Sequence, residues 1–164
     1  MHGVRKAGGW LAAAGVTALA ICGFAAARAP IGAWMLGRMF DSRAGVDIRD
    51  SLPDGLHVAL CGTGSPLPDP SRAGPCSTVI AGRHIFVVDA GEGGARTMGL
   101  MTIPHGAIEA LFLTHLHSDH IDGLNPIALM RWTSGANTTP LPVYGPAGTD
   151  RVVAGFNAAY AIDD

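Results

Sequence analysis

Histidine and carboxylate side chains crowd into one short stretch of the sequence, residues 114–120. The stretch holds three of the chain's seven histidines together with one aspartate. Neutral imidazole is the commonest protein ligand for zinc, and carboxylate oxygen also binds this ion. His115 and His117 lie two residues apart, so on an extended segment both rings point the same way and reach one ion. Asp119 and His120 follow at a turn and are placed to face a second ion.

A pair of metal ions predicts a particular kind of chemistry. Two ions about 3.5–4 Å apart stabilise both the attacking and the leaving oxygen when an ester is hydrolysed. The spacing of the four side chains therefore predicts a metal-dependent hydrolase that acts on phosphate or related esters. The candidate ligands are His115, His117, Asp119 and His120.

A short buried strand must position this cluster. The apolar run 110–113 leads directly into it, which is typical of a strand that ends where the polar cluster begins. The cluster then lies at the carboxyl end of the strand, where α/β folds place their ligands. Other apolar runs and turn residues predict strands at 57–61, 76–81, 84–88 and 141–146, and helices beginning near 91, at 121–132 and at 148–162.

Several stretches together resemble one protein superfamily. The His-x-His-x-Asp-His pattern after a hydrophobic strand is similar to the signature of the metallo-β-lactamase fold. The Gly-Thr-Gly-Ser turn at 62–65, the Asp-Ala-Gly-Glu-Gly stretch at 89–93 and the Val-Tyr-Gly-Pro stretch at 143–146 resemble its ribonuclease Z and arylsulfatase branch. The resemblance covers residues 56–164. It implies an α/β fold in which two sheets form a sandwich between helices, an αββα architecture.

The resemblance also implies roles for individual residues. It implies two zinc ions, the first held by His115 and His117 and the second by Asp119 and His120. Asp119 is also expected to accept a proton from the attacking water, which makes it the candidate catalytic residue. Asp89 is not expected to bind metal. Its carboxylate would accept backbone N–H bonds and organise the metal loop, and it can cap a helix at the same time.

Only part of the family's domain is expected in this chain. Domains of this family consist of two similar halves, and the remaining metal ligands come from the second half. No histidine follows His120 in the sequence. We therefore expect an incomplete, N-terminal portion of a longer enzyme, or a truncated and inactive remnant. We expect the 164 residues alone to be inactive.

The N-terminal region carries a membrane-targeting pattern. Arg5 and Lys6 close a short basic region, residues 1–6, which is expected to stay in the cytoplasm. An uncharged stretch of about 20 residues follows, long enough to cross a bilayer as a helix. We favour an uncleaved signal anchor at 7–29 over a signal peptide cleaved near Ala27.

This topology predicts where the rest of the chain lies. An anchor places the remainder on the periplasmic or extracellular side of the membrane, and cleavage of the signal would secrete it. Residues 30–55 are expected to form a juxtamembrane linker, although helically spaced apolar residues at 31–40 suit either a membrane interface or packing on the domain. The N-terminal part of the hydrolase domain is expected at 56–164.

Cys61 and Cys76 flank the proline-rich loop. Export would allow a disulfide between them. We favour two small buried thiols, because the strands that carry them need not be in register.

Several polar side chains outside the cluster receive structural assignments. His57 and His84 fall in strand patterns and are interpreted as structural, and His105 is expected to be solvated in a loop. Asp122 is assigned to the start of a helix, where the helix dipole favours a carboxylate.

Charge bears on the substrate. From residue 30 onward the chain has eight arginines, no lysine and 13 acidic residues, for a formal charge of −5. A surface that binds tRNA should be basic, so tRNA stays open as a partner without support from charge. We expect a ribonuclease Z-like, zinc-dependent hydrolase of a small phosphodiester or sulfate ester. A lactonase or β-lactamase-type hydrolase on the same fold is the alternative, and homodimerisation stays open.

Overall fold

The computed structural model describes residues 28–38, 45–67 and 69–162 of the chain. Its contacts divide it into two units, with the boundary between Val46 and Asp47. Within the first unit the described residues 28–38 form a helix, as the apolar spacing there predicts. The predicted signal anchor at 7–29 falls almost entirely outside the described residues. Among the helices that are described, none has both the length and the apolar character needed to cross a bilayer.

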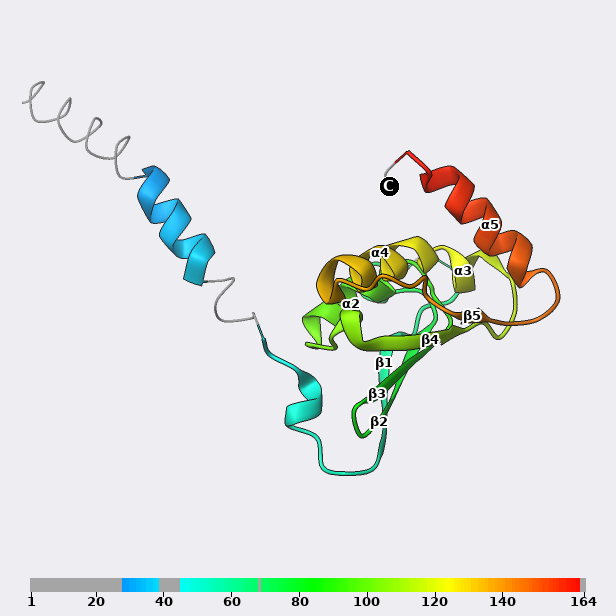
Figure 1. Ribbon diagram of the computed structural model, residues 1–164, viewed down its shortest axis with the longest axis horizontal. Coiled ribbons are helices and arrows are strands. Elements are labelled where there is room, and N and C mark those ends of the chain that lie inside the picture. Colours follow the sequence, from blue (N-terminus) through cyan, green and yellow to red (C-terminus); the bar gives the residue numbers. More distant parts are fainter. Residues whose placement is uncertain (1–27, 39–44, 68, 163–164) are drawn as a thin grey trace, which may run out of the picture. The chain divides into compact units, whose positions relative to one another are not determined.

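The second unit is built on a five-stranded mixed sheet (Figure 1). Its strands are β1 (Leu56–Gly62), β2 (Cys76–Ala81), β3 (His84–Val88), β4 (Ile108–Phe112) and β5 (Val143–Tyr144). They lie side by side in sequence order; β1, β2 and β3 pair antiparallel, whereas β3, β4 and β5 pair parallel. The strands predicted from the apolar runs are all present, with β5 shorter than expected.

The α-helices of this unit are α2 (Gly94–Leu100), α3 (Ser118–Ile121), α4 (Leu124–Gly135) and α5 (Thr149–Tyr160), and two short 3-10 turns are η1 (Ile48–Asp50) and η2 (His105–Ala107). One helix predicted at 121–132 is in fact two. The break falls at Gly123, whose N–H donates to Ala90 O at 2.7 Å. A Cβ at Gly123 would lie 2.4 Å from Gly91 O, so only glycine permits this backbone contact.

The main core lies between the sheet and its helices. On one face of the sheet, alternate strand residues are fully enclosed, because helices cover them. Figure 1 shows α2 and α4 on this face. The largest enclosed side chains are Ile80, Ile85, Met98, Ile103, Ile108, Leu111 and Ile127.

The opposite face of the sheet is also apolar, but it is exposed. Leu56, Val58 and Leu60 on β1 are 72%, 61% and 58% exposed. Phe112 contributes an aromatic contact on this face and stacks on Tyr144 at 5.3 Å between ring centroids. Apolar side chains on both faces are what a sheet needs when a second layer packs over it, as in a sandwich.

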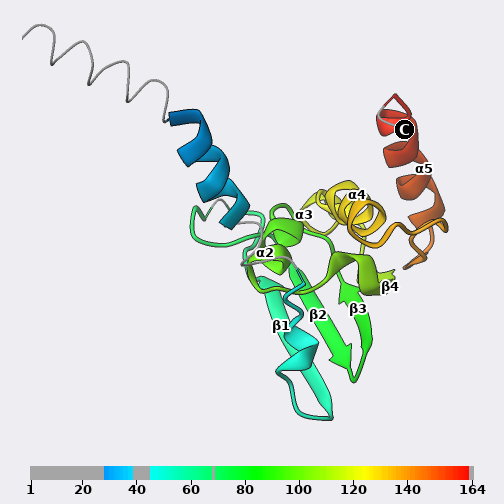
Figure 2. The same cartoon turned by 60° about the vertical axis from the view of Figure 1, so that its left-hand side comes forward.

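The direction of the strands determines where the loops meet. Since β1, β3, β4 and β5 all run the same way, their carboxyl ends share one edge of the sheet (Figure 2). The segments that follow these strands are 63–75, 89–93, 113–117 and 145–148. We call this the carboxyl edge.

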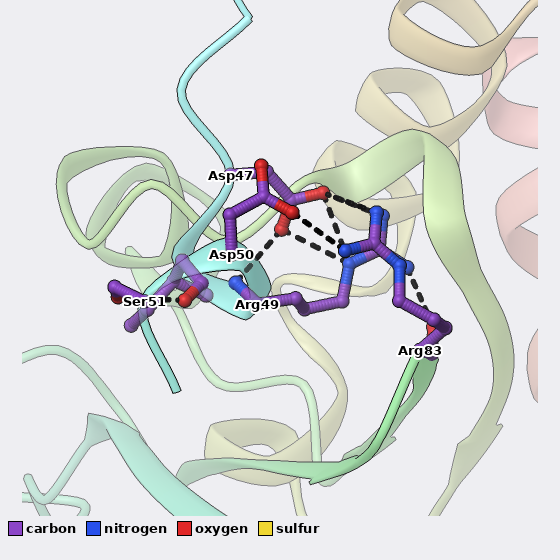
Figure 3. A network of polar contacts seen from close by, with 6 residues as sticks. Asp47, Arg49, Asp50, Ser51 and Arg83 are labelled. Carbon is purple, nitrogen blue, oxygen red and sulfur yellow. Dashed lines mark hydrogen bonds and ion pairs between the residues drawn. The ribbon is translucent and has the colours of Figure 1, made fainter. Parts of the chain in front are cut away.

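The opposite edge carries an ion-pair network (Figure 3). Asp47 accepts hydrogen bonds from Arg49 N at 2.9 Å, Nε at 3.0 Å and Nη2 at 2.6 Å. Arg83, in the β2–β3 turn, pairs with Asp50 at 2.6 Å. The Arg49 side chain holds the pKa of Asp47 below its usual value, and Asp47 in turn raises the pKa of Arg49. The network therefore attaches the segment before β1 to the hairpin turn.

The structure contradicts the expectations for the two cysteines and for His105. Cys61 and Cys76 form a disulfide with their Cα atoms 5.0 Å apart, because an irregularity in the β1–β2 pairing turns Cys61 inward next to Cys76. His105 is not solvated; it is 4% exposed, and its Nε2 lies 2.8 Å from Ala95 O. Burial lowers the pKa of His105, and the hydrogen bond to Ala95 opposes that shift only in part.

Candidate metal centre

The candidate metal centre lies at the carboxyl edge, where β3 and β4 run parallel and end beside each other. Asp89 directly follows β3, and the segment from Thr114 to His117 follows β4 before α3 begins. Asp89 N donates to Phe112 O at 2.8 Å, which joins the two strand ends. The structure thus brings the histidine motif and the distant Asp89 together, as the parallel pairing requires.

Asp89 sits in the left-handed region of the backbone map, with φ of 60°. Few residues other than glycine adopt this conformation, and where one does, the strain often accompanies function. The conformation lets the carboxylate accept hydrogen bonds from Thr114 N at 2.8 Å and from Thr114 Oγ1 at 2.9 Å. The side chain is largely buried. It therefore fixes the start of the loop that carries the histidines.

Thr114 connects Asp89 to the first histidine. Its Oγ1 lies 3.0 Å from His115 Nδ1 as well as next to the carboxylate of Asp89. A hydroxyl has one proton, and an ionised carboxylate only accepts, so the hydroxyl donates to Asp89 and accepts from His115 Nδ1–H. This tautomer leaves Nε2 of His115 without a proton and free to bind a metal.

His115 and His117 approach each other through the nitrogens that are available for binding. His115 Nε2 lies 3.1 Å from His117 Nδ1. Two nitrogens bound tetrahedrally to one zinc ion at 2.0–2.1 Å would lie about 3.3 Å apart. The observed separation fits two ligands of one ion, in agreement with their alternate positions on an extended segment.

Asp119 and His120 form a second pair, in α3. His120 Nε2 lies 3.6 Å from Asp119 Oδ2, again close to the spacing of two ligands on one ion. On the other side of the ring, His120 Nδ1 lies 2.9 Å from Asp89 Oδ2. The approach is an electrostatic contact without hydrogen-bond alignment, since Nδ1 is buried with no aligned partner among the described residues. The carboxylate nevertheless favours a proton on Nδ1, which leaves Nε2 for a metal.

Each pair supplies only two ligands. The rings of His115 and His120 are also close, with centroids 4.0 Å apart, so the two pairs are neighbours. Among the residues that the structure describes, no three histidine, cysteine or acidic side chains enclose a common point as a metal site would. A tetrahedral zinc ion on either pair would therefore take its remaining ligands from elsewhere.

A cavity of about 470 Å3 opens beside Asp119. One side is formed by the loop between β1 and β2, including Ser65, Leu67 and Arg72. The other side includes Ser118 and Asp122. A larger cavity of about 750 Å3 lies between α4 and α5, and none of the candidate metal ligands lines it. We therefore take the smaller cavity as the one that belongs to the candidate centre.

His57, His84 and Asp122 stand apart from the ligand pairs. His57 Nε2 lies 2.8 Å from Pro53 O, and His84 Nδ1 lies 2.7 Å from Glu109 Oε1. Asp122 follows the end of α3 rather than starting a helix, and it faces the cavity. Thr114 is the contact that the sequence motif alone did not assign. Its position directly before His115 was the available signal.

The fold defined by this sheet and these loops is that of the metallo-β-lactamase superfamily. The short form of human tRNase Z superposes with a TM-score of 0.56 and 27% sequence identity, over 63% of this chain and 40% of that one. A metallo-β-lactamase fold protein from Bacillus subtilis, YhfI, superposes with a TM-score of 0.52 at 23% identity, over 60% of this chain and 40% of that one. The superfamily predicted from the histidine motif is confirmed.

Sequence comparison identifies the family within this class. The chain belongs to the family of the anti-Pycsar protein Apyc1, whose sequence profile matches residues 57–145, more than half of the chain. It is also 44% identical to ribonuclease Z of Mycobacterium avium over 101 residues, covering 60% of this chain and 36% of that protein. For ribonuclease Z of Mycobacterium sp. strain KMS the identity is 45% over 109 residues, covering 66% and 38%. The chain thus spans little more than a third of the length of these relatives.

Proposed function

We propose that this chain carries the metal-binding part of a zinc-dependent hydrolase that cleaves a small phosphodiester. The observation that carries the proposal is the pairing of binding atoms at the carboxyl edge, His115 with His117 at 3.1 Å and Asp119 with His120 at 3.6 Å. The family and its ribonuclease Z relatives support hydrolysis on this fold.

The residues present fit zinc in their chemistry. His115 and His117 would hold one ion, and Asp119 and His120 would hold a second. When bound, zinc supplies hydroxide at neutral pH, because it lowers the pKa of a bound water to about 7. Asp119 would accept the proton that the water releases. Asp89 would orient the rings of His115, through Thr114, and of His120, so that their Nε2 atoms stay unprotonated.

The cavity and the charge favour a small substrate over tRNA. The cavity beside Asp119 measures about 470 Å3, within the range of small-molecule sites. Arg72 supplies its positive charge, against acidic side chains that include Asp69 and Glu92. From residue 30 onward the formal charge is −5, the opposite of what binding to an RNA backbone needs. A sulfate ester shares the tetrahedral centre of a phosphodiester and is the nearest competing substrate class.

A substrate panel tests this proposal. The complete gene product, prepared with zinc, would be assayed on bis(p-nitrophenyl) phosphate, p-nitrophenyl sulfate and a 3′-extended tRNA precursor. We expect turnover of the phosphodiester with kcat/KM well above that of the sulfate. Preferential processing of the tRNA precursor would contradict the small-substrate proposal, and hydrolysis of the sulfate alone would replace the phosphodiester.

We also propose that the domain lies outside the cytoplasm. The uncharged stretch after Lys6 supports this location, and so does the Cys61–Cys76 disulfide, because disulfides persist mainly in oxidising compartments. Alkaline phosphatase fused after Asp50 should be active in a bacterial host. An inactive fusion, with a cytoplasmic reporter active at the same junction, would contradict the proposed topology.

A further inference from the structure

The loop between β1 and β2 forms one side of the cavity next to Asp119. We define Gly62, at the end of β1, together with the described residues of the loop, 63–67 and 69–75, as the pocket wall. The β1–β2 ladder stops where the wall begins, since its pairing becomes irregular between Leu60 and Gly62. Bulges of this kind commonly terminate strand pairing. Something other than the ladder must therefore hold the base of the wall.

The Cys61–Cys76 disulfide lies at this base. Cys61 is 0% exposed and Cys76 is 2% exposed, so the bond is enclosed between the two strands. Immediately above it, Gly64 N donates to Ala73 O at 2.7 Å, which joins the two sides of the wall. A Cβ at Gly62 would lie 1.7 Å from Gly74 O, so the two backbones are in direct contact there. The disulfide is the covalent part of this closure.

The wall is also hydrogen-bonded to the turn after β3, residues 89–93. Gly74 N donates to Glu92 O at 2.8 Å, and Gly91 N donates to Pro75 O at 2.8 Å. A Cβ added at Gly91 would lie 2.7 Å from Asp119 O and 2.5 Å from Pro75 N. The turn after β3 is thus packed between the wall and Asp119 without room for a side chain. A change at the base of the wall is transmitted to the cavity through these backbone contacts.

We propose that the Cys61–Cys76 disulfide is a positioning element of the substrate pocket, which holds the wall against the turn after β3 that packs on Asp119. The proposal rests on the proposed hydrolase function for the identity of the pocket. Neither Cys61 nor Cys76 lines the cavity, so the disulfide acts on the cavity through the wall. Without the bond, the wall, including the cationic Arg72, samples positions in which the pocket no longer matches its substrate. Substrate binding should then weaken while the metal-dependent step continues.

The test compares a variant that lacks the bond with a variant whose core is destabilised while the bond is kept. Cys61→Val with Cys76→Ala removes the bond while keeping most of the buried volume. Ile80→Val, in the enclosed interior of β2, lowers stability and leaves the bond in place. Trypsin cleavage after Arg72, in the wall, would be compared with cleavage after Arg83, in the β2–β3 turn. The ratio reports local opening of the wall and requires neither substrate nor metal.

We expect the disulfide variant to raise the Arg72-to-Arg83 cleavage ratio about tenfold over wild type, and Ile80→Val to leave it unchanged. On bis(p-nitrophenyl) phosphate, KM should rise about tenfold with kcat changed less than about twofold. A ratio equal to that of Ile80→Val would overturn the proposal, as would an opened wall with an unchanged KM. If wild type hydrolyses no substrate, the proposed function fails, whereas the cleavage ratio still decides whether the disulfide holds the wall.

Discussion

The two edges of the sheet both carry charged side chains, but they satisfy them in different ways. At the edge with the β2–β3 turn, Asp47 is matched by three N–H groups of Arg49, and Asp50 is paired with Arg83 (Figure 3). At the carboxyl edge, His115 Nε2 and His117 Nδ1 face each other with no acid between them. The first arrangement is complete within the chain, and the second has binding atoms left for a ligand.

The two edges therefore separate stability from function in this fold. Changes at the completed edge should lower the free energy of unfolding and leave chemistry alone. Changes at the carboxyl edge should impair the chemistry without lowering the free energy of unfolding. Partly satisfied polar groups and left-handed residues such as Asp89 (φ 60°) are found there although they reduce stability.

Asp119→Ala is expected to have the largest effect. It removes the carboxylate that is one member of a ligand pair and that is also proposed to accept the water's proton. Turnover of the complete gene product on a small phosphodiester should fall by at least about 10²–10⁴-fold, the effect typical of losing acid–base help alone. Bound zinc should fall with it.

Asp122→Asn is the matched control for Asp119. Asp122 is exposed, follows α3 and takes part in neither ligand pair. Asparagine keeps the shape of this side chain, which lines the cavity, so the substitution should leave zinc bound and cost far less turnover than Asp119→Ala. Loss of zinc in Asp122→Asn together with full occupancy in Asp119→Ala would show that the ligand assignment is wrong.

Thr114→Val should have the next largest effect. Valine keeps the shape of threonine but removes the hydroxyl that connects Asp89 to His115 Nδ1. Partners that orient a metal-binding histidine typically contribute about 10–100-fold in metal affinity, so zinc binding should weaken by that factor. Thr114→Ser keeps the hydroxyl and should bind zinc like wild type, as measured by competition with a chromogenic chelator. Equal affinities in the valine and serine variants would rule out this role.

Asp47→Asn tests the completed edge. It leaves the guanidinium of Arg49, whose side chain is 11% exposed, without its charged partner. Urea unfolding at pH 7 should show a loss of about 1–2 kcal/mol with turnover unchanged. Because Arg49 lowers the pKa of Asp47, this stability is present above the unfolded-state pKa of about 3.9 and is lost as pH falls through the lower folded-state pKa.

Asp50→Asn is the comparison on the same edge. The Asp50 side chain is 67% exposed, so its pair with Arg83 should contribute less than about 1 kcal/mol. A loss of turnover in Asp47→Asn at full stability would break the proposed division between the two edges.

His105 gives the smallest expected effect, which is visible only in its pH dependence. Burial lowers its pKa, so the unfolded chain binds a proton before the folded one does. Stability should therefore be complete above about pH 6.5 and fall below it, by at most about 1.4 kcal/mol per pH unit. His105→Gln cannot titrate, so the slope of the unfolding free energy between pH 7 and pH 5 should be shallower by up to one proton. Identical slopes would mean that His105 protonates freely in the fold.

Local patterns were enough to predict much of this architecture. Continuous or alternating apolar residues mark β1 to β4, and the run that precedes His115 places the motif at a strand end. The family resemblance implies that Asp89 lies beside the histidine loop, and the parallel pairing of β3 with β4 explains this neighbourhood. These features depend on residues close in sequence, together with a resemblance carried by short motifs.

The features that could not be predicted from the sequence depend on tertiary contacts. The disulfide requires the register of β1 on β2, which is set across the loop between them and altered by an irregularity at Cys61. His105 is buried because α2 presents the Ala95 carbonyl to it. The break between α3 and α4 arises where Gly123 meets Ala90 and Gly91 on another segment. No pattern within a short window encodes such contacts.

We propose that zinc is bound by two pairs of side chains, His115 with His117 and Asp119 with His120. The most direct test is the zinc content of the complete gene product, measured by native mass spectrometry for wild type, His117→Ala and His120→Ala. We expect two zinc ions per chain in wild type and one in each variant, because each substitution breaks one pair. Wild type that stays free of zinc in its presence and still hydrolyses substrate, or two ions retained in both variants, would contradict it.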